Sequence, residues 1–173
     1  DAGTKNIKGS ELKNKFPYIN DDGIETVTYT DDKKEGWIDP YLFHGALKNK
    51  AMEQGAEFVK GEIKDISEIN SNIIICAVGY NTNNLLKDVP VVPQKHNVFK
   101  VSCPKHIAEM PLTSDFTTGV YWRPEGKEYL AGSPISSFNA SDLEPDWDHF
   151  EELVWPALAK RVPIFEELKL TGG

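Results

Sequence analysis

The sequence predicts an α/β fold, and three neighbouring stretches carry this prediction. A helix with clear start and stop signals follows Asp39 and ends at Gly55. Two apolar segments, residues 56–63 and 72–78, come after it and are typical of strands, the second fully buried. Because helices alternating with strands are typical of parallel sheets, we expect these two strands to belong to one.

The helix is predicted from its ends and from its spacing. The Asp39 carboxylate can accept a hydrogen bond from the first helical turn, and Pro40 suits the first helical position. Gly55 suits the left-handed conformation that follows a last turn. Apolar residues recur every three or four positions and predict one buried stripe, formed by Leu42, Phe43, Ala46, Leu47 and Ala51.

The segments on either side of this region predict a separate sheet. Residues 24–30 alternate in polarity and are rich in β-branched side chains, so they are expected to form a strand. A polar loop is expected at 31–35. The prolines within 89–93 indicate an edge or linker segment, and 97–102 is expected to be a short strand.

The last third of the chain predicts a hairpin followed by a broken helix. Residues 119–122 and 129–132 are expected to pair across a turn at 124–126. A helical stretch is expected to open at Pro145. Pro156 must kink or split it, because proline lacks the backbone N–H that an unbroken helix needs.

Composition excludes several classes of function. The chain has 173 residues and a net charge of -8, which argues against a nucleic-acid binder but leaves a phosphate-bearing cofactor open. No run of about 18 apolar residues occurs, so no transmembrane helix is expected. Two cysteines make neither a disulfide framework nor a zinc site. The histidines share no metal-ligand spacing, so no metal is expected at His44, His96, His106 or His149.

Two stretches are candidate sites, and each has an ordinary alternative. Gly79 ends the predicted buried strand, where the backbone could approach a cofactor, but the pattern alone favours a simple glycine turn after a core strand. Tyr121, Trp122 and Arg123 form an aromatic and cationic cluster. Arg123 could clamp a carboxylate, or the cluster could pack on a sheet with the arginine at its surface. The residues alone therefore predict an α/β protein with a candidate cofactor site.

Longer stretches resemble one enzyme family. Residues 36–58, GWIDPYLFHGALKNKAMEQGAEF, resemble the middle of the flavin-dependent amine oxidoreductases of the D-amino-acid oxidase and sarcosine oxidase type. IIICAVGY stands where that family has a buried strand ending in Ala-x-Gly, and VPVVPQKHNVFKV resembles the return into its substrate domain. The resemblance implies a partial FAD/NAD(P)-binding, Rossmann-like domain, residues 36–81. A mainly antiparallel substrate-domain sheet, formed by 1–35 and 82–173, would be interleaved with it.

The resemblance also implies a cofactor and a reaction. The cofactor is FAD, and the reaction is oxidation of an amine or N-methyl/amino-acid-like substrate by hydride transfer to the flavin. Matching positions assign cofactor contacts to Ile63, Ala77, Val78 and Gly79, and substrate contacts to Tyr121 and Arg123. No residue of this chain is assigned a catalytic role.

A second function is implied by a closer likeness within the family. FPYINDDG, EGWIDPY, GVYWRPEG and VWPALAKRVPIFEELKL are similar to a subgroup that serves in the assembly of mitochondrial respiratory complex I. The alternative is therefore a non-catalytic FAD-fold scaffold that binds complex I subunits. It would be mitochondrial, or cytoplasmic in a bacterium. The family's Gly-x-Gly-x-x-Gly fingerprint is expected before Asp1, so we expect this chain to be a fragment that is inactive alone.

Overall fold

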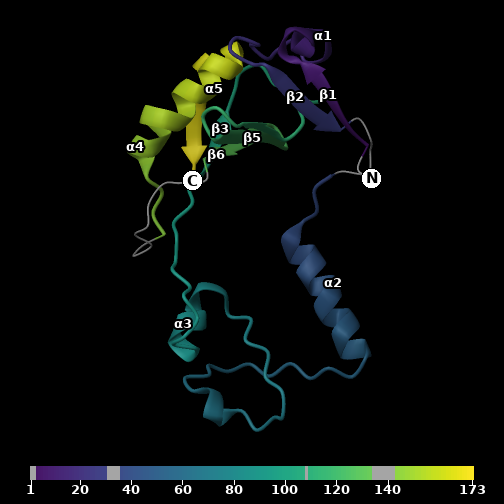
Figure 1. Ribbon diagram of the computed structural model, residues 1–173, viewed down its shortest axis with the longest axis vertical. Coiled ribbons are helices and arrows are strands. Elements are labelled where there is room, and N and C mark those ends of the chain that lie inside the picture. Colours follow the sequence, from purple (N-terminus) through teal and green to yellow (C-terminus); the bar gives the residue numbers. More distant parts are fainter. Residues whose placement is uncertain (1–2, 31–35, 108, 134–142) are drawn as a thin grey trace. The chain divides into compact units, whose positions relative to one another are not determined.

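The structure is a computed structural model that describes residues 3–30, 36–107, 109–133 and 143–173. It divides into two compact units (Figure 1). Unit 1 comprises Asp1–Lys5 and Tyr29–Val92, and unit 2 comprises Asn6–Thr28 and Pro93–Gly173. Helices and mainly antiparallel strands together confirm the predicted α/β class. The assignment of 36–81 to a flavin domain, and of its flanks to a substrate domain, stays a prediction.

Unit 2 is built on a five-stranded sheet with the order β4-β5-β6-β3-β7. Its neighbouring strands are antiparallel. The strands are β3 (Val98–Ser102), β4 (Thr113–Asp115), β5 (Val120–Glu125), β6 (Glu128–Gly132) and β7 (Lys169–Gly172). The predicted strand at 97–102 and the predicted hairpin are thus confirmed.

A smaller sheet lies near the start of the chain. It pairs β1 (Thr4–Lys8) with β2 (Thr26–Thr30), which confirms the strand predicted within 24–30. Between them lie the 3-10 turn η1 (Gly9–Glu11) and the short helix α1 (Leu12–Lys15). The polar loop predicted at 31–35 lies outside the described residues.

The broken helix of unit 2 changes its geometry just before Pro156, as its sequence predicts. Helix α4 (Trp147–His149) passes into a π-helical turn, η4 (Phe150–Val154), and then into α5 (Trp155–Arg161). Proline offers no N–H and its ring crowds the carbonyl four residues earlier, so the wider turn relieves the conflict without ending the helix. The 3-10 turn η5 (Pro163–Glu167) follows.

One face of the five-stranded sheet packs against these helices to form the core. Figure 1 shows α5 running alongside the sheet. Tyr129 meets Phe165 with ring centroids 5.0 Å apart, and Phe99 meets Phe150 at 5.1 Å. The largest fully buried side chains are Trp122, Tyr129, Phe99, Phe165, Leu158, Val101, Val120, Val154 and Val162. Burial of such side chains supplies most of the stabilising free energy of a domain.

Unit 1 is organised around helix α2 (Pro40–Glu53). The Asp39 carboxylate accepts a hydrogen bond of 2.9 Å from the backbone N–H of Leu42, so the predicted N-cap is confirmed. Gly55 has φ +94° and its N–H donates to the carbonyl of Met52, as the predicted C-terminal stop requires. The remaining elements of this unit are η2 (Ile66–Glu68), η3 (Gly79–Asn81) and α3 (Thr82–Leu85).

Four other predictions for this region are wrong in this structure. Residues 56–63 and 72–78 form no strand, so the expected parallel sheet is absent from the described residues. Their apolar side chains are largely exposed, with Val59 at 89% and Ile75 at 87%. The stripe on α2 is exposed as well, with Leu42 at 67%. Apolar runs become strands only beside a partner strand, and the described residues provide none here.

A buried ion pair ties three segments of unit 2 together. The Nε of Arg161 donates to the Asp115 carboxylate at 2.9 Å, with side-chain exposures of 5% and 9%. The Nη1 of Arg161 donates to the carbonyls of Asn20 and Asp22 at 2.8 and 3.1 Å. Burial by itself raises the pKa of Asp115, but hydrogen bonds from Thr117 and Arg161, with the arginine charge, outweigh this and lower it.

We predict that Arg161→Leu lowers the free energy of unfolding of unit 2 by about 3–5 kcal/mol, because it leaves a buried, unpaired carboxylate. Denaturant unfolding followed by tryptophan fluorescence measures this loss. Lys13→Ala is the control, because its pair with Asp21 is 58% and 26% exposed and should be worth about 1 kcal/mol at most. Equal effects from the two substitutions would contradict the prediction.

The Asp115 pair also predicts a pH dependence. The pKa of Asp115 is lower in the folded than in the unfolded chain, so its stabilisation is present above the unfolded value of about 3.9. That stabilisation is lost as the pH falls from there through the lower folded pKa. In Asp115→Asn, the free energy of unfolding should therefore fall less steeply as the pH drops below about 4. Near neutral pH, its dependence on pH should equal that of the unsubstituted protein.

Candidate functional site

The face of the five-stranded sheet that points away from the core is the candidate site. Burial alternates along β5, where Val120 and Trp122 are buried and the residues between and after them are half-exposed. We call this surface the open face; its central residues are Val98, Lys100, Tyr121, Arg123 and Leu130. An antiparallel sheet can carry such a face because its ladder satisfies the backbone without a second layer.

The predicted cluster of Tyr121, Trp122 and Arg123 is divided between the two faces. Trp122 is 1% exposed and belongs to the core. Tyr121 and Arg123 share the open face, because residues two apart on a strand point the same way. Tyr121 is level with Gly132 on β6, and Arg123 is level with Leu130, which in turn pairs with Lys100 on β3.

The cations of the open face are held by carboxylates. Arg123 pairs with Glu125 and also donates to the carbonyl of Pro124 at 3.2 Å. Lys100 Nζ lies 2.6 Å from a Glu128 oxygen. Hydrogen bonds from Lys100 and then Thr171 lower the pKa of the half-exposed Glu128 carboxyl. Fixed charges of both signs therefore lie beside the exposed apolar residues of this face.

Tyr121 presents a neutral hydroxyl near this charged region. Burial raises the pKa of Tyr121, and the nearby charge of Arg123 offsets this rise only in part. The phenol therefore stays protonated at neutral pH and can donate as well as accept a hydrogen bond. The face thus offers one aromatic ring, one hydroxyl and one guanidinium–carboxylate pair within two neighbouring strands.

The residues predicted to contact the cofactor lie in unit 1, in irregular backbone and at the start of η3. Ile63 and Val78 are each 42% exposed, and Ala77 is exposed too. Gly79 has φ +60°, and a Cβ placed on it would meet no atom within 4 Å. The described residues of this unit therefore form no cradle that fits FAD. Their assignment to the cofactor stays a prediction.

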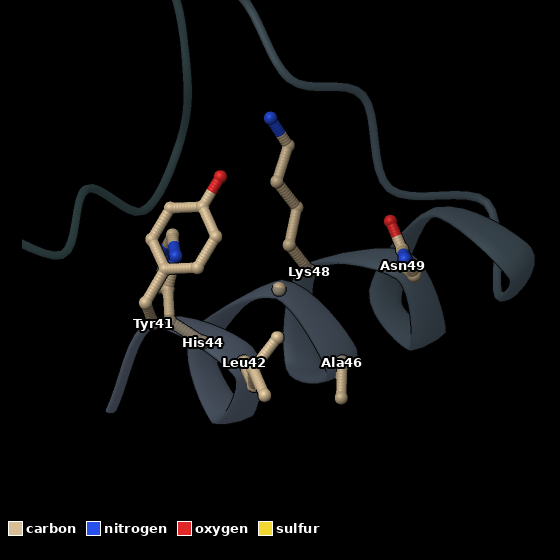
Figure 2. Close-up of a pocket in the computed structure, with 7 residues that line it drawn as sticks. Tyr41, Leu42, His44, Ala46, Lys48 and Asn49 are labelled. Carbon is tan, nitrogen blue, oxygen red and sulfur yellow. The ribbon is translucent and has the colours of Figure 1, made fainter. Parts of the chain in front are cut away.

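A shallow hollow runs along α2 in the same unit (Figure 2). It has a volume of about 540 Å³, and every residue that lines it belongs to this one helix. Tyr41 and Lys48 project to one side of the helix, and Leu42 and Ala46 to the other (Figure 2). A hollow lined by one helix is an uncovered helix surface, and it offers no converging groups for a ligand.

Sequence reasoning missed a polar cluster on the core side of the sheet, at the end of β6. The Oγ of Ser133 lies 2.7 Å from Nε2 of His149. Asn97 accepts a hydrogen bond from the backbone N–H of Asp146, and its buried Nδ2 has no partner in the described structure. Ser133 and Asn97 are 36 positions apart in the sequence, so no local pattern could have joined them. The contacts fix the start of α4 against the sheet.

The described part of the chain lacks two further kinds of site. There, no three histidine, cysteine or acidic side chains are grouped so that they could bind a metal ion. None of the described helices combines the length and the apolar character needed to cross a membrane.

Comparison with known proteins identifies the family. The family model described as "FAD dependent oxidoreductase" matches residues 2–172. The chain belongs to this family. FAD is the cofactor of the family, as the resemblance implied, and the match spans both units.

Several curated relatives carry the same descriptive name. "FAD-dependent oxidoreductase domain-containing protein 1" of Xenopus laevis is 30% identical over 92% of this chain and 42% of its own length. The protein of that name from Bos taurus is 28% identical over 94% of this chain and 44% of its length. The chain thus spans less than half the length of these relatives.

A solved structure has a similar fold. The L-proline dehydrogenase from P. horikoshii superposes with a TM-score of 0.70 over 98% of this chain and 51% of its own. The sequences are 19% identical, so the likeness concerns the fold. Because it covers nearly all of this chain, the likeness includes segments of both units.

A pair of glycines tests the placement of the cofactor. Gly79 and Gly55 have φ of +60° and +94°, and neither would bring a Cβ within 4 Å of another atom. Alanine should therefore strain both backbones alike, by about 1–2 kcal/mol. In the full-length protein, Gly79→Ala should lower the flavin bound per protein severalfold, and Gly55→Ala should not. Equal flavin content in the two variants would contradict the assignment of Gly79.

Proposed function

We propose that the whole protein oxidises an amine or an N-methyl/amino-acid-like substrate by hydride transfer to FAD, and that the open face is its substrate side. Family membership supports the use of flavin. The observation that carries the substrate class is the Arg123–Glu125 pair beside Tyr121. A zwitterionic substrate can bind both members of such a pair. Its carboxylate would bind the Arg123 guanidinium, and its ammonium would bind the Glu125 carboxylate.

The chain's own residues would bind and orient the substrate. Arg123 offers several donors in a fixed plane, which suits a carboxylate better than a lysine does. Its pairing with Glu125 and its bond to the Pro124 carbonyl keep the guanidinium on its strand before a ligand arrives. Tyr121 and Leu130 supply the apolar surface for the remainder of the substrate.

A second candidate function comes from a different class. The protein would act as a flavin-fold scaffold in the assembly of mitochondrial respiratory complex I. The observation that favours this function is the exposed apolar surface of unit 1, where Tyr41 is 82% and Ile75 87% exposed. Exposed apolar side chains that gather in one patch are typical of a protein-binding region.

Anaerobic spectroscopy separates the two functions. The full-length protein should be purified with visible flavin absorbance, which free or N-methylated amino acids should bleach when oxygen is excluded. A flavin that no such compound reduces would contradict the enzyme proposal. Co-purification with respiratory subunits would then support the scaffold, and its absence would count against it.

Replacement of Arg123 tests the substrate contact. Arg123→Met should raise KM for an amino-acid substrate about 10- to 100-fold, the effect of losing a charge-assisted hydrogen bond, with a smaller change in kcat. Lys127→Met is the control, because Lys127 lies in the exposed turn of the same hairpin. An equal rise in KM in both variants would show that substrate binding depends on the general positive charge of the hairpin and not on a contact with Arg123.

A further inference from the structure

The open face contains an unusually close approach between a side chain and the backbone of a neighbouring strand. Tyr121 and Gly132 are directly opposite each other on β5 and β6. A Cβ placed on Gly132 would lie 2.9 Å from the Tyr121 hydroxyl oxygen and 3.1 Å from its Cζ. The far end of the Tyr121 ring therefore occupies the space that any other residue at position 132 would fill.

This distance defines how the ring lies. A side chain that stood upright on the sheet would carry its hydroxyl well away from the opposite strand. The Tyr121 ring instead leans across β6 toward β3, whose neighbouring residue Asn97 has its carbonyl oxygen 2.6 Å from the same Cβ position. The Asn97 carbonyl, just before β3, therefore favours glycine at position 132, and any Cβ there would also push the far end of the Tyr121 ring aside.

We propose that Gly132 is a positioning residue that lets the Tyr121 ring lie flat across β6, where the ring forms the floor of the substrate site and limits the bulk of the substrate's apolar group. This inference rests on the proposed function, since it treats the open face as the substrate side. Beyond that function, it specifies that Gly132 determines the depth of the substrate site. The apolar group would lie on the ring, flanked by Val98, which is 41% exposed, and by Leu130.

The charged end of the site fixes where the apolar group must lie. Arg123 is two residues beyond Tyr121 on the same strand, which separates their Cα atoms by about 7 Å. This separation is similar to the distance that the side chain of an amino-acid substrate reaches from its amino and carboxyl groups. A substrate held by the Arg123–Glu125 pair would therefore place its side chain over the Tyr121 ring, and a raised ring would collide with the bulkier side chains first.

Two substitutions should shift substrate choice in opposite directions. Gly132→Ala lifts the ring and should lower kcat/KM for amino acids with large apolar side chains, relative to small ones, by about tenfold or more. Tyr121→Leu removes the ring and should shift the same ratio toward large side chains. Gly172→Ala is the control from the same sheet, because its new Cβ would meet only Lys100 Cβ, at 3.9 Å.

The position of the ring can be measured without turnover. Protons beneath an aromatic ring resonate upfield, so in full-length protein labelled with 13C-glycine the Gly132 signal should be shifted upfield. That signal should disappear in Gly132→Ala and lose its shift in Tyr121→Leu. If Gly132→Ala does not fold, because the Asn97 carbonyl cannot move, Tyr121→Leu still decides both measurements.

The outcomes separate this inference from the proposed function. Failure of the unsubstituted, flavin-loaded protein to oxidise any amine or amino acid would overturn the proposed function and the inference with it. Normal turnover with an unchanged preference in both variants would overturn the inference alone. An unshifted glycine signal would overturn the ring placement on which it depends.

Discussion

The organisation of unit 2 depends on the buried pair between Arg161 and Asp115. The arginine comes from the end of α5, the aspartate from the end of β4, and the carbonyls of Asn20 and Asp22 complete the contacts. A buried charge pair is costly to desolvate, and it is tolerated where its remaining hydrogen-bond donors have acceptors. Here the two carbonyls accept the hydrogen bonds of the Arg161 Nη1. Helix, sheet and N-terminal loop are therefore joined at one point, which fixes the face that the helices cover.

Because the helices cover one face of the five-stranded sheet, the opposite face, the open face, is free to bind a ligand. The alternation along β5 sends Trp122 into the core and Tyr121 and Arg123 outward, so one strand contributes to stability and to the candidate site. Gly132 is where the two roles meet. Its missing side chain leaves room for the Asn97 carbonyl, just before β3, and for the Tyr121 ring. Register in the sheet therefore determines the shape of the candidate site, since a slip of one residue would exchange the faces.

The features that sequence predicted correctly have causes within a few residues of each other. Asp39 caps a helix that begins at the next residue, and Pro156 disturbs the turn that immediately precedes it. Strands within residues 56–63 and 72–78 failed because a strand is completed by partners far away in the sequence. The contact of Tyr121 with Gly132 was likewise invisible, because it depends on strand register, although the residue types at both positions were plain.

The missing strands also explain why the residues predicted to contact the cofactor lie in irregular backbone or at the start of η3, whereas those predicted to contact the substrate lie in a sheet. Side chains such as Val59 and Ile75 each gain about 1.5–3 kcal/mol when they are fully buried, and in this structure most of that free energy is not realised. A sheet neighbour that covered them would order residues 56–63 and 72–78 and, at the end of the second segment, Gly79. Any ligand that binds only the ordered form would then stabilise it in turn. Completion of that sheet and binding of the flavin are therefore expected to be coupled, whereas the open face of unit 2 has its geometry already built by its own core.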